Sequence, residues 1–220
     1  MAAEAKSVLF DQFALVGKAL SSGRRTELVD VLAQGERSVE ALAEQIGQSV
    51  ANTSQHLQVL ARSGLVASQR DGNRVVYRLA GEQVEVLWEM LRAVAADNIA
   101  GVRPAADRYL GDRGEIEQVS RDDLVRRLGE GVVVWDVRPR AEFEAGHVPG
   151  AVSVPPEEVQ RRLAEVPEGV EVVAYCRGRF CVFADEAVRA LAARERRAMR
   201  LEDGFPEWRR AGLPVAVGAG

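Results

Sequence analysis

The only two cysteines of this 220-residue chain lie in one short segment, and that segment constrains how the second half of the chain can fold. Residues 171–182 read Glu-Val-Val-Ala-Tyr-Cys-Arg-Gly-Arg-Phe-Cys-Val. The apolar, β-branched run Val172–Tyr175 predicts a buried strand that ends at Cys176. A loop around Gly178 follows, and a helical pattern then covers about residues 182–193. The fold of the second half of the chain must therefore contain a buried strand that is followed by a tight loop and then by a helix.

This loop suits a cysteine thiolate. The N–H groups of a tight loop and of a helix N-terminus favour negative charge, and Arg177 and Arg179 stand beside Cys176. Cys176 is therefore a candidate nucleophile. The alternative is that both cysteines only pack, because free cysteine is among the most buried residue types.

Two further segments carry a family resemblance. Residues 132–154 read Val-Val-Val-Trp-Asp-Val-Arg-Pro-Arg-Ala-Glu-Phe-Glu-Ala-Gly-His-Val-Pro-Gly-Ala-Val-Ser-Val. This resembles the first signature of the rhodanese family, a strand followed by D-x-R-x-x-x-E-F-x-x-G-H-x-P-G-A. Residues 201–215, Leu-Glu-Asp-Gly-Phe-Pro-Glu-Trp-Arg-Arg-Ala-Gly-Leu-Pro-Val, resemble the closing signature, W-x-x-x-G-x-P-V after a Gly-containing turn. With the cysteine loop between them, the resemblance covers residues 116–217.

The resemblance implies an α/β rhodanese-like domain with a central, mostly parallel sheet and helices on both faces. The active loop would lie at the carboxyl end of a central strand. It also implies a sulfurtransferase, in which the Cys176 thiolate takes sulfur from thiosulfate or a persulfide, holds it as a persulfide and passes it to a thiol acceptor. Backbone N–H groups would cradle the persulfide, and the two arginines would attract the anionic donor. The loop residues so implied are Arg177, Gly178, Arg179, Phe180 and Cys181.

Cys181 has three interpretations. It packs under the start of the helix, or it resolves the persulfide on Cys176 into a disulfide or trisulfide. The third interpretation, in which Cys181 binds a metal ion, is disfavoured because it would leave a tetrahedral site short of ligands. The phosphatases related to this scaffold need a longer loop that ends in Arg, whereas this chain has Val182 there. We expect neither a metal nor a cofactor.

The polar residues of the first signature are interpreted as structural. Asp136 can bond the neighbouring loop or Arg138, and Arg138 and Glu142 are four residues apart, a spacing suited to pairing on a helix. His147 precedes a turn. Sulfur transfer through a thiolate needs no partner base.

The first hundred residues form a different module. Ser38 caps a predicted helix over residues 39–46, and Ser49 caps a second over residues 50–62. Two strands around Asp71-Gly72 predict a hairpin. Two helices joined by a turn and followed by a hairpin indicate a mainly α winged helix-turn-helix.

Residues 49–66, Ser-Val-Ala-Asn-Thr-Ser-Gln-His-Leu-Gln-Val-Leu-Ala-Arg-Ser-Gly-Leu-Val, resemble the recognition helix of the ArsR/SmtB repressors, S-x-x-x-x-S-x-H-L-x-x-L-x-x-x-G-L-V. A helical wheel places Val50, Thr53, Leu57, Leu60 and Ala61 inward. Asn and Gln on the outer face suit adenine edges, and Ala can meet a thymine methyl. The residues expected to contact DNA are Ser49, Ala51, Asn52, Ser54, Gln55, His56, Gln58, Arg62, Arg70, Asn73 and Arg74.

The charge around the predicted DNA-binding surface is positive, although the first hundred residues together are acidic. Residues 1–100 hold ten basic and twelve acidic residues, whereas residues 45–80 hold four arginines against Asp71 alone. A basic stripe can bind phosphates on an acidic domain. The cysteine and histidine ligands of ArsR-type metal sensors are missing from their usual places.

Apolar-periodic helices over residues 8–20 and 84–94 either pack internally or, as in ArsR-like proteins, pair two copies across a two-fold axis. We expect residues 1–98 to form the DNA-binding and dimerisation domain, 99–115 a helical linker and 116–217 the rhodanese-like domain.

Two cysteines so close together do not build a disulfide framework. With no long apolar stretch and no signal-peptide pattern, we expect a cytoplasmic protein without a membrane partner.

We therefore interpret the chain as a DNA-binding transcriptional regulator that responds to reactive sulfur through a persulfide on Cys176. Its expected partners are a double-stranded operator, a small sulfur donor (thiosulfate or a persulfide), a thiol acceptor and a second copy of the chain. One alternative is a sulfurtransferase whose winged helix only dimerises or localises it. Another is a DNA-binding protein with an idle rhodanese scaffold.

Overall fold

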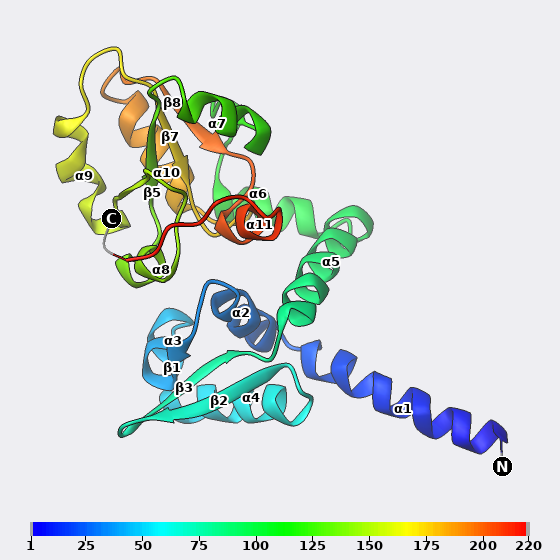
Figure 1. The fold of residues 1–220 in the computed structure, drawn as a ribbon. Coiled ribbons are helices and arrows are strands. Elements are labelled where there is room, and N and C mark those ends of the chain that lie inside the picture. The colour runs from blue at the N-terminus through cyan, green and yellow to red at the C-terminus, as the bar shows by residue number, and fades with distance from the viewer. Residues whose placement is uncertain (1, 219–220) are drawn as a thin grey trace. The chain divides into compact units, whose positions relative to one another are not determined.

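The computed structural model describes residues 2–218 and divides into two compact units at the boundary between Ile99 and Ala100 (Figure 1). Each unit has hydrophobic core clusters of its own.

The first unit is mainly helical, with a small antiparallel sheet of strand order β1-β3-β2. This is the winged helix-turn-helix predicted from the sequence. Its elements are α1 (Ala2–Leu20), α2 (Gly23–Leu32), β1 (Arg37–Ser38), α3 (Val39–Gln45), α4 (Val50–Arg62), β2 (Val66–Asp71), β3 (Arg74–Leu79) and α5 (Glu82–Asn98).

Serine caps fix the starts of the two central helices. The side chain of Ser38 accepts a hydrogen bond from the backbone N–H of Ala41, and that of Ser49 accepts one from Asn52, both at 3.3 Å. Such a cap satisfies a backbone donor that has no partner within the helix. The predicted bounds of α4 are confirmed, and α3 ends one residue earlier than predicted.

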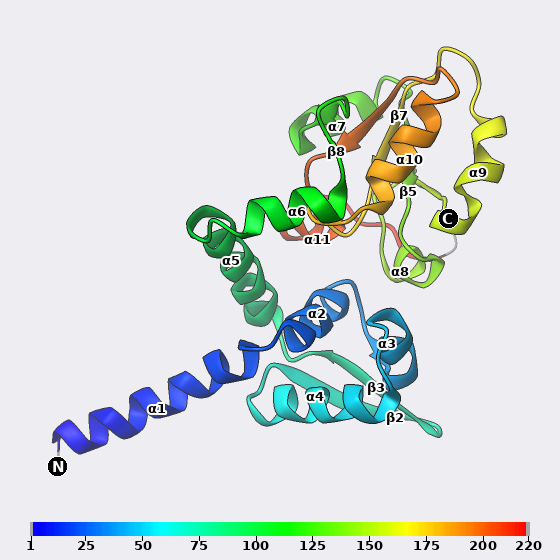
Figure 2. The same ribbon diagram turned by 180° about the vertical axis from the view of Figure 1, so that it is seen from behind.

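The hairpin of β2 and β3 is confirmed, with its register running from Val66 opposite Leu79 to Asp71 opposite Arg74. Gly72 takes a φ of +60°, a left-handed conformation that glycine adopts without steric cost. In both ribbon views the tip of this hairpin extends beyond the end of α4 (Figures 1 and 2).

The second unit is an α/β domain with a five-stranded sheet of order β4-β8-β7-β5-β6, in which the strand pairs are parallel. The fold class implied by the rhodanese resemblance is thereby confirmed. Its elements are α6 (Val102–Leu110), β4 (Gln118–Val119), α7 (Arg121–Leu128), β5 (Val133–Asp136), α8 (Arg140–Ala145), β6 (Val152–Ser153), the 3-10 turn η1 (Pro156–Glu158), α9 (Val159–Arg162), the 3-10 turn η2 (Leu163–Glu165), β7 (Val172–Tyr175), α10 (Phe183–Ala192), β8 (Ala198–Leu201) and α11 (Phe205–Arg210).

Strand β7 lies in the middle of this sheet and is buried on both faces. Val172 and Ala174 pack in the cluster that holds α9 and α10. Val173 and Tyr175 pack in the other cluster, with residues of α7, α8 and α11. Successive side chains of a strand point to opposite faces, so a continuous apolar run is what a central parallel strand requires. The strand delivers Cys176 to the carboxyl edge of the sheet.

The turn after α10 contains a residue in a left-handed backbone conformation. Among residues 2–218, Glu195 is the non-glycine residue with a positive φ, at +57°. The next N–H, of Arg196, donates back to the carbonyl of Leu191 and closes the helix. The left-handed conformation costs an L-residue about 1–2 kcal/mol. The turn therefore keeps the shape of a glycine cap without the glycine.

We expect Glu195→Gly to raise the free energy of unfolding by roughly 0.5 kcal/mol, because relief of left-handed strain slightly exceeds the added chain entropy of glycine. The measurement is urea unfolding of the full chain. Arg194→Gly is the matched control and should lower the same free energy, since Arg194 has no positive φ. An equal decrease in the free energy of unfolding of both variants would contradict the claim that Glu195 is strained.

Candidate functional site

Cys176 directly follows β7 and is only 2% exposed. Its sulfur is joined to that of Cys181 in a disulfide. Cys181 is half-buried and packs against the same apolar cluster as Cys176. The disulfide lies within the loop. Cys181 both packs in the apolar cluster and bonds to Cys176, so this structure fits the packing interpretation and the interpretation in which Cys181 reacts with Cys176.

The two arginines of the loop differ in their surroundings. Arg177 forms a forked contact with Glu142, with its Nη2 2.5 Å from Oε1 and its Nε 3.1 Å from both carboxylate oxygens. The charge of Arg177 therefore already faces a carboxylate. Arg179 is exposed and has no ion-pair partner within residues 2–218. Of the two, Arg179 presents the guanidinium that an incoming anion can reach.

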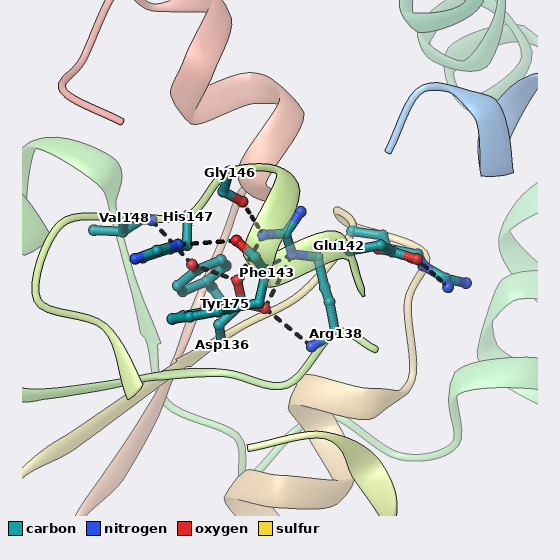
Figure 3. Close-up of polar contacts among 9 residues, drawn as sticks. Asp136, Arg138, Glu142, Phe143, Gly146, His147, Val148 and Tyr175 are labelled. Carbon is teal, nitrogen blue, oxygen red and sulfur yellow. Dashed lines mark hydrogen bonds and ion pairs between the residues drawn. The ribbon is translucent and has the colours of Figure 1, made fainter. Parts of the chain in front are cut away.

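Arg138 forms its ion pair with Asp136 rather than with Glu142, because helix α8 begins at Arg140 and helical spacing does not apply to Arg138. The charge of Glu142 is still one of the causes that raise the pKa of Arg138. Glu142 is fully buried and points away from the cluster around Asp136 (Figure 3).

Asp136 and Arg138 instead form a buried ion pair beneath the end of the strand (Figure 3). Arg138 Nη2 lies 2.6 Å from Asp136 Oδ2 and 2.6 Å from the carbonyl oxygen of Gly146. The hydroxyl of Tyr175 donates to Asp136 at 2.6 Å and accepts the N–H of Val148 at 3.1 Å. The interpretation that Asp136 bonds Arg138 is confirmed.

Two groups of this network, Tyr175 and Arg138, have raised pKa values. Burial and the neighbouring charge of Asp136 raise the pKa of Tyr175 well above its ordinary value. Burial opposes the charged form of Arg138, but its hydrogen bonds to Asp136 raise its pKa overall. His147 stacks on the ring of Phe143, and its Nδ1 lies 2.9 Å from that residue's carbonyl oxygen. None of these groups is placed as a base beside Cys176.

The turn between β8 and α11 packs directly on the cysteine loop. The N–H of Phe205 donates to the carbonyl of Cys176 at 3.0 Å. A Cβ atom at Gly204 would lie 2.2 Å from the nitrogen of Gly178 and 2.4 Å from the carbonyl carbon of Arg177. Only glycine leaves room for this approach of two backbones.

The outer face of α4 presents the side chains expected to read DNA bases. Ala51, Asn52, Gln55, Gln58 and Arg62 are exposed, and Ser54 and His56 lie half-buried on the flanks. The thirteen residues of α4 include no acidic residue. At the hairpin tip, Arg70, Asn73 and Arg74 are exposed, as is the cap residue Ser49. The sequence prediction and the exposure of these residues agree.

Two inward positions of the helical wheel are wrong. Val50 is 46% exposed and Ala61 is exposed, whereas Thr53, Leu57 and Leu60 are buried as predicted. Both lie at the ends of α4, where no neighbouring element covers them. The buried stripe of α4 is therefore narrower than the wheel suggests.

No cluster of three or more histidine, cysteine, aspartate or glutamate side chains suited to a metal ion occurs within the described part of the chain. Across the same residues, no helix is both long enough and apolar enough to span a membrane.

Sequence reasoning missed a third set of residues around the loop: Arg113, Asp185 and Arg200. Arg200 offered a signal, because it is a charged residue in the otherwise apolar strand β8 and is only 2% exposed. A buried arginine must be paired. Arg113 gave no such signal, since its partner Asp185 lies 72 residues away.

Comparisons with known proteins follow the same division of the chain. The model of the bacterial regulatory proteins of the arsR family matches residues 22–68, and that of the rhodanese-like domain matches residues 120–211. The HTH-type transcriptional regulator Rv0324 of Mycobacterium tuberculosis is 46% identical over 215 residues, which cover 97% of this chain and 94% of the relative.

A sulfurtransferase of Allochromatium vinosum is 28% identical over 107 residues, covering 48% of this chain and 99% of that protein. Among solved structures, the homodimeric winged helix-turn-helix DNA-binding domain (fragment 1–100) Mb0332 from Mycobacterium bovis is 46% identical, covers 44% of this chain and 89% of that one, and has a TM-score of 0.42.

We expect Gly204→Ala to lower the free energy of unfolding by roughly 2 kcal/mol, because the added methyl group overlaps the backbone of the cysteine loop. Denaturant unfolding of the full chain measures this loss. Gly101→Ala is the matched control, since nothing lies within 4 Å of a Cβ there. Equal stability of the two variants would show that the turn does not press on the loop.

Proposed function

The chain belongs to the ArsR family of bacterial regulatory proteins and joins its winged helix to a C-terminal rhodanese-like domain, and we propose that this domain makes it a transcriptional regulator that responds to reactive sulfur. The observation that carries the proposal is that the two cysteines share one loop and are within bonding reach of each other. The signal enters at Cys176, and the winged helix gives the response at DNA.

The sulfur step begins with both cysteines reduced. The Cys176 thiolate attacks the outer sulfur of thiosulfate, the sulfur–sulfur bond of thiosulfate breaks, and sulfite leaves with the bonding electron pair. Cys176 then carries a persulfide. A polysulfide donor gives the same product and releases a shorter polysulfide. The likeness of this domain to a sulfurtransferase supports the step.

Cys181 resolves the persulfide. Its thiolate attacks Sγ of Cys176, the bond from Sγ to the outer sulfur breaks, and hydrosulfide leaves. The product is the Cys176–Cys181 disulfide present in the structure. Two equivalents of a low-molecular-weight thiol return the pair to the reduced form and become a disulfide themselves. The loop thus has three covalent states, namely dithiol, persulfide and disulfide.

The DNA surface is the exposed face of α4 together with the hairpin tip. An exposed helix face rich in Asn and Gln fits the major groove, where amide side chains pair with adenine. The exposed arginines of the hairpin supply phosphate contacts.

We infer that the functional form is a homodimer. Helix α1 exposes Phe10 and Phe13 at 58% and 63%, and α5 exposes Met90 and Val94 at 54% and 56%. Large apolar side chains repeated along two helices mark an interaction surface. A two-fold pair of winged helices also matches a palindromic operator.

Coupling between the loop and DNA passes along the chain between α5 and the rhodanese-like domain. Such coupling free energies are typically about 1–3 kcal/mol, or about 5- to 150-fold in affinity. The response in operator affinity should fall in this range.

Two substitutions test the DNA surface. Gln55→Ala should cost about 1–3 kcal/mol on the cognate operator through loss of base contacts. Arg74→Ala should weaken cognate and random DNA alike and reduce the salt slope by about one. Binding is measured by titration of labelled DNA at several salt concentrations. Gln83→Ala, an exposed glutamine on α5, is the control. Unchanged binding in both test variants would exclude this surface.

A second experiment tests the proposed function. Wild type should release sulfite from thiosulfate, and its operator affinity should change after polysulfide treatment. Cys176→Ser should release no sulfite, and its operator affinity should be the same before and after treatment. Cys181→Ser should still release sulfite in the first half-reaction.

The outcomes of this experiment separate the alternatives. Sulfite release without an operator response would indicate a sulfurtransferase with a tethered winged helix. Operator binding without sulfite release or a response would indicate an idle scaffold. The same operator response in wild type and Cys176→Ser would mean that sulfur acts elsewhere.

A further inference from the structure

Arg113, in the segment between α6 and β4, contacts the cysteine loop. Its Nη1 donates to the carbonyl of Arg179 at 2.9 Å, and its Nη2 donates to that of Cys181 at 3.4 Å. Its Nε and Nη2 lie 2.6 and 2.5 Å from Oδ2 of Asp185 on α10. One guanidinium therefore joins two loop carbonyls to a buried carboxylate.

Arg200 on β8 repeats this arrangement from within the domain. Its Nε lies 2.8 Å from the other oxygen of Asp185, and its Nη2 donates to the carbonyl of Gly178 at 3.0 Å. Asp185 is fully buried between the two arginines. Three carbonyls of the loop, those of Gly178, Arg179 and Cys181, are thus held by two guanidiniums that share one anchor.

Holding these carbonyls also sets the direction of the loop N–H groups. In a trans peptide the C=O and the following N–H point in opposite directions. With the carbonyls turned to the arginines, the N–H groups of Arg179, Phe180 and Val182 are turned the other way. These are the donors that a persulfide or a thiosulfate oxygen needs, and such donors act only when they are fixed in place.

The charges around the loop favour an anion as well. Two arginines share a single carboxylate, and exposed Arg179 adds a third guanidinium nearby. Burial and the charges of Arg113 and Arg179 lower the pKa of Arg200. An anion bound in the loop would relieve this excess of positive charge.

We propose that Arg113 is a positioning residue for sulfur transfer at Cys176, which holds the loop carbonyls so that the loop N–H groups face the sulfur. The inference rests on the proposed function, because it takes Cys176 as the site of chemistry. Arg113 lies before residue 120, where the match to the rhodanese-like family begins. Arg113 therefore lies outside the segment matched by the family model but within the second compact unit of the chain.

The chain offers a matched control in Arg189 of α10. Its Nη2 donates to the carbonyls of Leu110 and Asp112 at 3.1 and 2.6 Å. It binds the segment that carries Arg113, and these hydrogen bonds do not involve the cysteine loop. Loss of Arg189 therefore loosens the segment while leaving the loop contacts of Arg113 in place.

The test compares Arg113→Gln, Arg113→Lys and Arg189→Gln in the full chain. Arg113→Gln should lower kcat/KM for sulfite release from thiosulfate at least tenfold. It should also shift the Cys176–Cys181 equilibrium with glutathione at least tenfold toward the dithiol, or about 30 mV, because the disulfide form would lose its loop contacts. Arg189→Gln should change neither quantity more than twofold.

Arg113→Lys covers the case in which the glutamine variant does not fold. A lysine keeps a cation beside Asp185 but lacks the forked donors of arginine. Its thermal unfolding should stay close to wild type while the glutathione equilibrium still shifts. The proposal would be overturned if Arg113→Lys had the same glutathione equilibrium as wild type. It would also be overturned if Arg113→Gln and Arg189→Gln shifted that equilibrium equally.

The glutathione measurement needs no sulfurtransferase activity. If wild type releases no sulfite, the proposed function fails, and a shifted equilibrium in Arg113→Gln would still support the role of Arg113 in fixing the loop. If wild type releases sulfite and Arg113→Gln does so at the same rate, the positioning role alone is wrong.

Discussion

The buried carboxylate of Asp185 imposes the strictest requirement on the rhodanese-like domain. A charge without contact to solvent is strongly unfavourable unless it is paired and hydrogen-bonded. Oδ2 of Asp185 accepts a hydrogen bond from Arg113, whereas Oδ1 is paired with Arg200 at 2.8 Å without hydrogen-bond geometry. Because both arginines also hold loop carbonyls, the need to pair one buried ion becomes a restraint on the shape of the loop. Helix α10, strand β8 and the segment between α6 and β4 all take part in it.

A second set of buried charges supports the loop from the other face of the sheet. Glu142 on α8 binds Arg177, the first residue after Cys176, and Asp136 with Arg138 fixes the neighbouring strand end. Removal of one partner from such a pair typically costs about 3–5 kcal/mol, because the other charge is left buried alone. The backbone of the loop is thereby held on both sides.

The sequence predicted those features that depend on local chemistry. The caps at Ser38 and Ser49, the hairpin at Gly72 and the buried strand before Cys176 follow from residues close to one another in the chain, and all four are confirmed. Arg138 forms its ion pair with Asp136 rather than with Glu142, because α8 begins two residues too late for helical spacing to apply.

Contacts between segments that are far apart in the chain could not be predicted from the sequence. Val50 and Ala61 fit the apolar face of a wheel, but the wheel does not tell where neighbouring elements end. Nothing in the pattern around Arg113 indicated that it would meet Asp185, because the two come together only after the sheet and α10 have formed. The contacts of the DNA surface and the role of Cys181 stay predictions.

The contact between Arg113 and Asp185 also bears on how such a domain can be transferred between proteins. A fragment cut at residue 120, where the family match begins, would lose Arg113 and leave Asp185 with Arg200 as its remaining ion-pair partner. A fragment meant to keep both partners of Asp185 must therefore begin before Arg113, within the compact unit that starts at Ala100.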